Sequence, residues 1–255
     1  MKRTVLALLC LSLAGTARAG DPPPQRELVV LAAASLRDAF TAIAKSFEAS
    51  HPGVHVILSF SGSQDLRAQV EHGGAADVFA SADAAPLKAL EAAGLSRPST
   101  VFARNVLVVV VPQGNPSGIA TFDDLPKAKK LVIGVPESPI GGYTVKVFQR
   151  ADKAHPGFLA SVQKQVASRE LNARQVLAKV SLGEADAGIV YRTDALTARG
   201  KVATVEIPAA LNEIAEYPIA ALTQGKQPAL AQEFIALVTG AEGQRLLARQ
   251  GFQAR

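Results

Sequence analysis

The sequence has a single cysteine in 255 residues. This residue, Cys10, lies in an apolar stretch close to the N-terminus, so a disulfide framework is excluded as the source of stability. The fold must therefore depend on an apolar core, and a hydrophobic content of 48% is ample for one. The length allows either one large domain or two domains of about 100 residues each.

Long apolar runs are also missing. The first apolar stretch, from Val5 to Leu13, is far shorter than the roughly 20 residues that a membrane-spanning helix needs. Basic residues precede it and Ala-Arg-Ala follows it, a layout that predicts a secretory signal peptide over residues 1–19. Leucine rather than a small residue precedes Cys10, which argues against lipid attachment. We therefore expect a soluble mature chain in the periplasm.

Basic runs interleaved with aromatic residues are absent, and aromatic residues make up only 5% of the chain. The predicted signal peptide holds three of the 27 basic residues and none of the 22 acidic ones, so its removal lowers the formal net charge from +5 to +2. Neither the charge nor its distribution indicates a nucleic-acid partner.

Recognisable catalytic and metal-binding motifs are missing as well. No Gly-x-Ser-x-Gly nucleophile motif occurs. His51 and His55 are four residues apart but flank Pro-Gly, so they do not share a helix face as metal ligands at that spacing would. We expect no metal site. An exported hydrolase with Ser35 or Ser63 as nucleophile stays an alternative, although it lacks a convincing histidine partner.

What the sequence does contain is a repeated alternation of short β-branched runs and longer stretches of helical period, beginning at Glu27. This alternation predicts an α/β fold with a mostly parallel sheet covered by helices. A long apolar strand is expected at 105–112, followed by a turn-rich stretch, after which the alternation restarts. The restart suggests two lobes. One more extended segment at 217–223 and two helices are expected to close the chain.

Two junctions between an expected strand and the next helix carry serine. At the first, Ser35 follows three alanines, and Asp38 stands three residues later, the pattern of a capping box. At the second, Ser61-Gly62-Ser63 precedes a helix. Each junction offers a hydroxyl and unpaired backbone N–H groups at the positive end of a helix dipole. Together they predict an anion site, although each serine could equally be an ordinary helix cap.

Three further junctions belong to the second series. They are the glycine-containing loop 136–142, the helix start after Asn172, which is a plausible N-cap, and Tyr191 at the end of a strand. Each alone is compatible with an ordinary turn, helix start or packing residue. Ligand sites in open α/β sheets form at the carboxyl ends of strands, which is where all five junctions lie.

The chain resembles the periplasmic molybdate-binding proteins of ABC importers over essentially the whole mature sequence. The resemblance rests on six segments in this order: "AAASL" at 32–36, "SFSGS" at 59–63, "GGAADVFASAD" at 73–83, "NVLVVVVP" at 105–112, "GIVYRTDA" at 188–195 and "YPIA" at 217–220. It implies a type II periplasmic-binding-protein fold with the ligand in a cleft between two lobes. The implied division is lobe 1 at 20–106 and 217–255, and lobe 2 at 107–216.

The resemblance also implies a set of oxyanion ligands. They are two serine hydroxyls from lobe 1 and two backbone amides and a tyrosine hydroxyl from lobe 2, which fall on Ser35, Ser63, Ile140, Ala173 and Tyr191. The segment "SPIGGY" departs from the Pro-Ala-Gly-x-Tyr that is commoner in the family. This departure leaves the loop donor open between Ile140 and Gly141.

The implied function is capture of molybdate or tungstate and delivery to a membrane permease with its cytoplasmic ATPase. The protein would act as a monomer, without a cofactor and without catalysis. Because molybdate carries no proton at neutral pH, its site needs donors only, whereas a phosphate-selective site would offer an acceptor. Asp65 and Arg67 could supply such a pair, but we expect them on the solvent side of a first helical turn. The same fold binding sulfate, phosphate or a small organic anion is the alternative.

Overall fold

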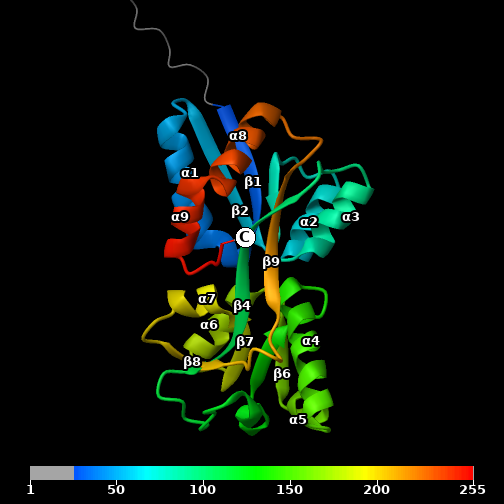
Figure 1. Cartoon of the computed structure of the whole chain (residues 1–255), viewed down its shortest axis with the longest axis vertical. Helices are drawn as coiled ribbons and strands as arrows, with labels where there is room; N and C mark the ends of the chain where they lie inside the picture. The colour runs from blue at the N-terminus through cyan, green and yellow to red at the C-terminus, as the bar shows by residue number, and fades with distance from the viewer. Residues whose placement is uncertain (1–25, 255) are drawn as a thin grey trace, which may run out of the picture.

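The structure is a computed structural model that describes residues 26–254. The predicted signal peptide, 1–19, lies outside the described residues. The strands follow the order β2-β1-β3-β9-β4-β7-β5-β6, with β8 on β4, and Figure 1 shows them divided between two lobes that lie one above the other. The α/β class and the two lobes are as the sequence predicted.

Lobe 1 is built on three parallel strands and one antiparallel strand: β1 (Arg26–Ala33), β2 (Val54–Ser61), β3 (Val78–Ala80) and β9 (Ile214–Ala221). Its helical elements are η1 (Ala34–Leu36), α1 (Arg37–Ser50), α2 (Ser63–Glu71), α3 (Ala84–Ala92), α8 (Pro228–Thr239) and α9 (Ala241–Arg249).

Alternate residues of β1 face the two layers of helices in lobe 1. Val30 belongs to a cluster with residues of α1 and α8, whereas Leu31 belongs to one with residues of α2 and α3. This is the period of two that a strand imposes on its side chains. Helices α8 and α9 lie beside α1 (Figure 1), where the Phe47 and Phe234 rings pack edge to face at 5.4 Å. The closing helices thus pack against the first helix of lobe 1.

Lobe 2 contains three parallel strands and two that run antiparallel to β7 or β4: β5 (Leu131–Gly134), β6 (Val166–Glu170), β7 (Ala187–Tyr191), β4 (Thr100–Pro112) and β8 (Val202–Glu206). Its helical elements are η2 (Phe122–Lys127), α4 (Pro139–Ala154), α5 (Phe158–Lys164), α6 (Ala173–Ser181) and α7 (Arg192–Thr197).

Two long strands connect the lobes. β4 pairs with β9 from Thr100 to Val106 and then with β7 and β8 from Leu107 to Pro112. The division of the chain at 106/107 and 216/217 stays a prediction, because β4 and β9 each run through it without a break. Within residues 26–254, no helix is both long and apolar enough to cross a membrane.

Candidate functional site

Four helix starts and the end of β7 surround one small cavity between the lobes. Its lining includes all five ligand residues predicted from the sequence: Ser35, Ser63, Ile140, Ala173 and Tyr191. The cavity is small, with an open volume of about 20 Å³, which is enough for at least one water-sized group. The structure therefore brings together residues that span more than half of the sequence.

The capping-box prediction for Ser35 is wrong. Ala33, whose backbone is extended, is the residue that precedes η1, and Ser35 lies inside this 3-10 turn, so its hydroxyl is not at the capping position. The Ser35 hydroxyl instead lies 3.1 Å from that of Tyr217. Asp38 forms an ion pair with Arg174 of lobe 2. Neither side chain is used to start its own helix.

Ser63 is the first residue of α2 and is 1% exposed. Its hydroxyl oxygen accepts a hydrogen bond from the backbone N–H of Ala82 at 3.1 Å. Next to it, a Cβ at Gly62 would lie only 2.7 Å from the backbone oxygen of Leu171 in lobe 2. Glycine at this position therefore permits the close approach of the two lobes. The Gln64 side chain also joins them, because its amide nitrogen donates to the same Leu171 oxygen at 2.9 Å.

Helix α4 begins earlier than the sequence indicated, because Pro139 to Gly142 belong to the helix rather than to a loop. Proline suits a first helical position, where its missing N–H would have no partner anyway. Ser138 caps the helix by accepting the Gly141 N–H at 3.2 Å, and it donates its own proton to the Val135 carbonyl at 2.7 Å.

Helix α6 is capped by Asn172, which accepts the Gln175 N–H at 3.1 Å, so the predicted N-cap is confirmed. In both α4 and α6 the cap satisfies an amide further along the first turn. The backbone N–H groups of Ile140 and Ala173 then donate to no acceptor among residues 26–254. Both residues line the cavity, so free amides at two helix starts border the same space.

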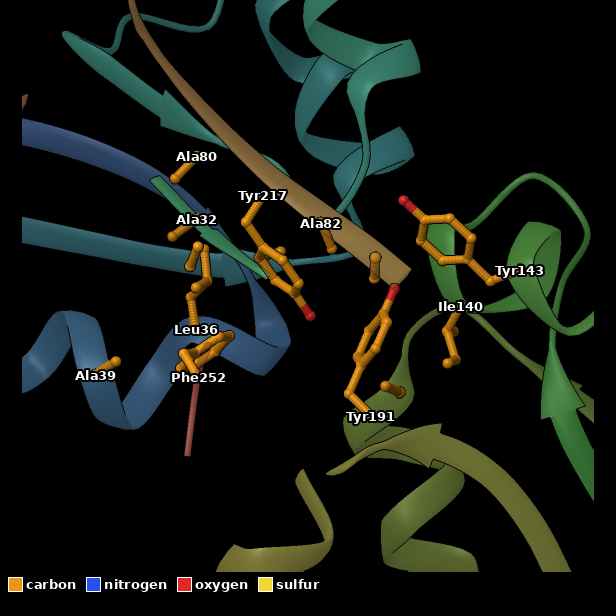
Figure 2. Packing of buried hydrophobic residues seen from close by; sticks show 14 of the residues in the cluster. Ala32, Leu36, Ala39, Ala80, Ala82, Ile140, Tyr143, Tyr191, Tyr217 and Phe252 are labelled. Atoms are coloured by element: carbon orange, nitrogen blue, oxygen red, sulfur yellow. The ribbon is translucent and has the colours of Figure 1, made fainter. Parts of the chain in front are cut away.

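Tyr191 ends β7 and is 1% exposed, yet its hydroxyl has no hydrogen-bond partner among the described residues. In Figure 2 the ring of Tyr191 lies between Tyr217 and Ile140. It packs edge to face against the Tyr217 ring, with 5.7 Å between the ring centroids. Burial raises the pKa of Tyr191 well above its ordinary value, so the hydroxyl keeps its proton. A buried phenol without a hydrogen-bond partner is destabilising, so this hydroxyl is available as a donor to a group placed in the cavity.

Among residues 26–254, no charged residue lines the cavity. Asp65 accepts from the Ser61 hydroxyl and Arg67 pairs with Glu71, so these two residues lie on α2 outside the lining. Among the described residues there is also no His/Cys/Asp/Glu cluster that could hold a metal ion. The site consists of neutral hydroxyls and amides at the positive ends of helices, an arrangement that can hold a small anion.

The geometry does not support the hydrolase alternative. The hydrogen bonds of the histidines within residues 26–254 go to neighbouring backbone atoms, to Ser50 and to Glu48 and Glu233, and none reaches Ser35 or Ser63. A serine nucleophile needs a base within hydrogen-bond reach. Neither serine has one in this structure.

Sequence reasoning missed two sets of residues around the cavity. One is an ion-pair chain in which Arg174 joins Asp194 of its own lobe and Asp38 of lobe 1, each at 2.5 Å. Burial raises the pKa of Asp194 to about 6, although Arg174 opposes the shift. The other set is Asn105 and Tyr217, buried polar residues on the crossing strands. No local sequence pattern distinguished Asn105 and Tyr217, because both lie in runs that are otherwise typical of strands.

The chain matches known proteins over most of its length. Residues 28–253 match the family described as bacterial extracellular solute-binding protein. The molybdate-binding protein ModA of Mycobacterium tuberculosis is 42% identical over 236 residues, which cover 92% of this chain and 87% of that protein.

Two solved structures share the fold. The sulfate-binding protein SubI of Mycobacterium tuberculosis superimposes with a TM-score of 0.81 at 22% identity, covering 90% of this chain and 87% of the other. The periplasmic molybdate-binding protein of Azotobacter vinelandii does so with a TM-score of 0.77 at 20% identity, covering 89% and 99%. The cavity between two α/β lobes and the match over residues 28–253 lead to one conclusion: the chain belongs to the bacterial extracellular solute-binding protein family.

Proposed function

We propose that this protein captures molybdate or tungstate in the cavity between its lobes and delivers it to a membrane permease with a cytoplasmic ATPase. It acts in the periplasm as a monomer and catalyses no reaction. The observation that carries the proposal is the composition of the cavity, to which the described part of the chain contributes hydroxyls and amides and no charged side chain. The 42% identity to a protein named for molybdate binding supports the choice of ligand.

The proposed ligand groups are the hydroxyls of Ser35, Ser63 and Tyr191 and the amides of Ile140 and Ala173. Between Ile140 and Gly141 we propose Ile140 as the donor, because the Gly141 amide already donates to Ser138. The Ile140 amide is free within the described residues. A backbone donor also accommodates the departure of this loop from the usual family sequence.

The chemistry of the anion fits these donors. Molybdate is a tetrahedral dianion without a proton at neutral pH, so it can accept from every group in the cavity and needs no acceptor in return. Hydrogen bonds to a charged group contribute about 1.5 to 3 kcal/mol each, and five of them can exceed the roughly 8 kcal/mol of micromolar binding after the costs of closure. Helix ends and neutral donors therefore suffice without a counter-ion.

Sulfate is the second candidate, because it has the same charge and shape and because a protein named for sulfate binding shares the fold. The two anions differ in bond length, so the size of the cavity decides between them. Phosphate is disfavoured, because its protonated form would need an acceptor and no carboxylate lines the cavity.

Titration calorimetry on the mature protein with molybdate, tungstate, sulfate and phosphate tests the proposal. We expect molybdate and tungstate to bind with similar dissociation constants and at least about 100-fold more tightly than sulfate, a difference of roughly 2.7 kcal/mol. Sulfate binding as tightly as molybdate would contradict the molybdate assignment and favour the second candidate.

A further inference from the structure

The inference concerns a buried polar residue on one of the strands that connect the lobes. Tyr217 on β9 is fully buried. Its hydroxyl lies 3.1 Å from that of Ser35. This contact joins a connecting strand to a proposed ligand group.

The direction of this hydrogen bond follows from the acidity of the two hydroxyls. A phenol is a stronger acid than an aliphatic alcohol and is therefore the better donor. We therefore take Tyr217 as the donor and the Ser35 oxygen as the acceptor in this contact.

Ser35 has one hydroxyl proton, and its orientation depends on what occupies the oxygen. When Tyr217 donates to the Ser35 oxygen, the Ser35 proton is directed away from Tyr217. We propose that Tyr217 is a positioning residue that keeps the Ser35 hydroxyl proton directed at the bound anion. This inference rests on the proposed function and adds the reason that Ser35 acts as a donor.

The second serine of lobe 1 has the same arrangement. The Ala82 N–H donates to the Ser63 oxygen, so the Ser63 proton is also left for the cavity. Ser138 in lobe 2 provides the contrast, because its proton goes to the Val135 carbonyl and its hydroxyl serves the helix. In lobe 1 the protein donates to each serine oxygen, and each serine then donates to the ligand.

A double-mutant cycle tests the role of Tyr217. Molybdate affinity is measured by calorimetry for the mature protein, Tyr217→Phe, Ser35→Ala and the double variant, and thermal unfolding of each is recorded. We expect Tyr217→Phe to weaken binding about tenfold when Ser35 is present and less than about twofold in the Ser35→Ala background. Tyr143→Phe, which removes a phenol hydroxyl outside the cavity lining, is the matched control and should bind like the unchanged protein.

Each outcome decides the inference. An equal loss in both backgrounds would show that Tyr217 acts through general packing, and no loss in the presence of Ser35 would remove its role entirely; either result overturns the proposal. If Ser35→Ala itself binds molybdate normally, the assignment of Ser35 as a ligand fails first. If the unchanged protein does not bind molybdate, the proposed function fails, which distinguishes the two failures.

Discussion

The two lobes present their donors to the cavity in different ways. Lobe 1 presents side chains: the Ser35 hydroxyl is paired with that of Tyr217, the Ser63 oxygen accepts from the Ala82 amide, and neither serine caps its own helix. Lobe 2 uses Ser138 and Asn172 as caps, and the backbone amides of Ile140 and Ala173 have no acceptor within residues 26–254. A serine at a helix start can thus serve either the helix or a ligand, and the sequence pattern is nearly the same in both cases.

This difference predicts which substitutions affect binding. Lobe 1 should be sensitive to loss of its serine hydroxyls, whereas the amide contacts of lobe 2 should tolerate a change of side chain. Tyr191 is the exception in lobe 2, since its contribution comes from a side chain.

The largest effect is expected when both lobe 1 hydroxyls are removed. Ser35→Ala combined with Ser63→Ala should weaken molybdate binding at least about 100-fold, because two hydrogen bonds to a charged ligand are lost. Calorimetry gives the affinity, and thermal unfolding shows whether the fold is retained. Ser46→Ala, a lobe 1 serine that bonds Glu242 on the surface, is the control. A loss of molybdate affinity of less than about threefold would contradict the assignment of these two hydroxyls as ligand groups.

Tyr191→Phe should weaken molybdate binding by about 10- to 100-fold, since one hydrogen bond to the anion is lost. Stability should change little or rise slightly, because the phenol has no partner among the described residues and phenylalanine avoids burying an unpaired hydroxyl. Affinity and the unfolding midpoint are measured on the same samples. Unchanged affinity would mean that this tyrosine is only a packing residue.

Ser138→Ala sharpens the comparison, because it makes the same chemical change at a serine in lobe 2. The free energy of unfolding should fall by about 1 kcal/mol through loss of the α4 cap. Molybdate affinity should change much less than in Ser35→Ala, since the Ser138 proton is already donated to Val135. Chemical denaturation and calorimetry measure the two quantities. A large affinity loss without destabilisation would place Ser138 among the ligands and remove the contrast between the lobes.

Asp38→Asn tests the ion pair that joins the lobes beside the cavity. The Asp38 side chain is 44% exposed, so its pairing with Arg174 should contribute only about 0.2 to 1 kcal/mol. We expect molybdate to dissociate up to about fivefold faster at low salt, with a smaller difference at high salt. Stopped-flow dissociation measures this rate, with Asp123→Asn on lobe 2 as a control for the charge change. Equal dissociation rates for the two variants would show that the pair does not stabilise the closed cleft.

Ile140→Val should have the smallest effect on binding. The proposed contact is the backbone N–H, which valine also supplies, so molybdate affinity should stay within about twofold. The free energy of unfolding should fall by about 0.5 to 1.5 kcal/mol, because the Ile140 side chain is 1% exposed and loses a methylene. If the free energy of molybdate binding falls by more than the free energy of unfolding, the Ile140 side chain rather than its amide is in contact with the ligand.

Sequence patterns predicted much of the fold because periodicity reports which faces are buried. The alternation of strands and helices predicted the α/β class. The return of the closing helices to lobe 1 was implied by the family resemblance and not by periodicity. The start of α4 was placed too late, because Pro139 and the two glycines that follow Ile140 are typical of a loop when tertiary contacts are unknown. The five ligand residues were predicted from a resemblance rather than from periodicity, and their role in binding stays a prediction.

The sequence by itself determined the elements and the chemical types of the donors, because both depend on residues that are close in the chain. Only the tertiary structure decided how each donor is used. Whether a serine proton caps a helix or faces a cavity depends on partners 19 residues away for Ser63 and 182 residues away for Ser35. Such partners are set by the packing of segments that are distant in the chain, and no local pattern encodes them. The short stretch Ala33 to Ser35 therefore has the pattern of a capped helix start in the sequence and forms one wall of a shared cavity in the fold.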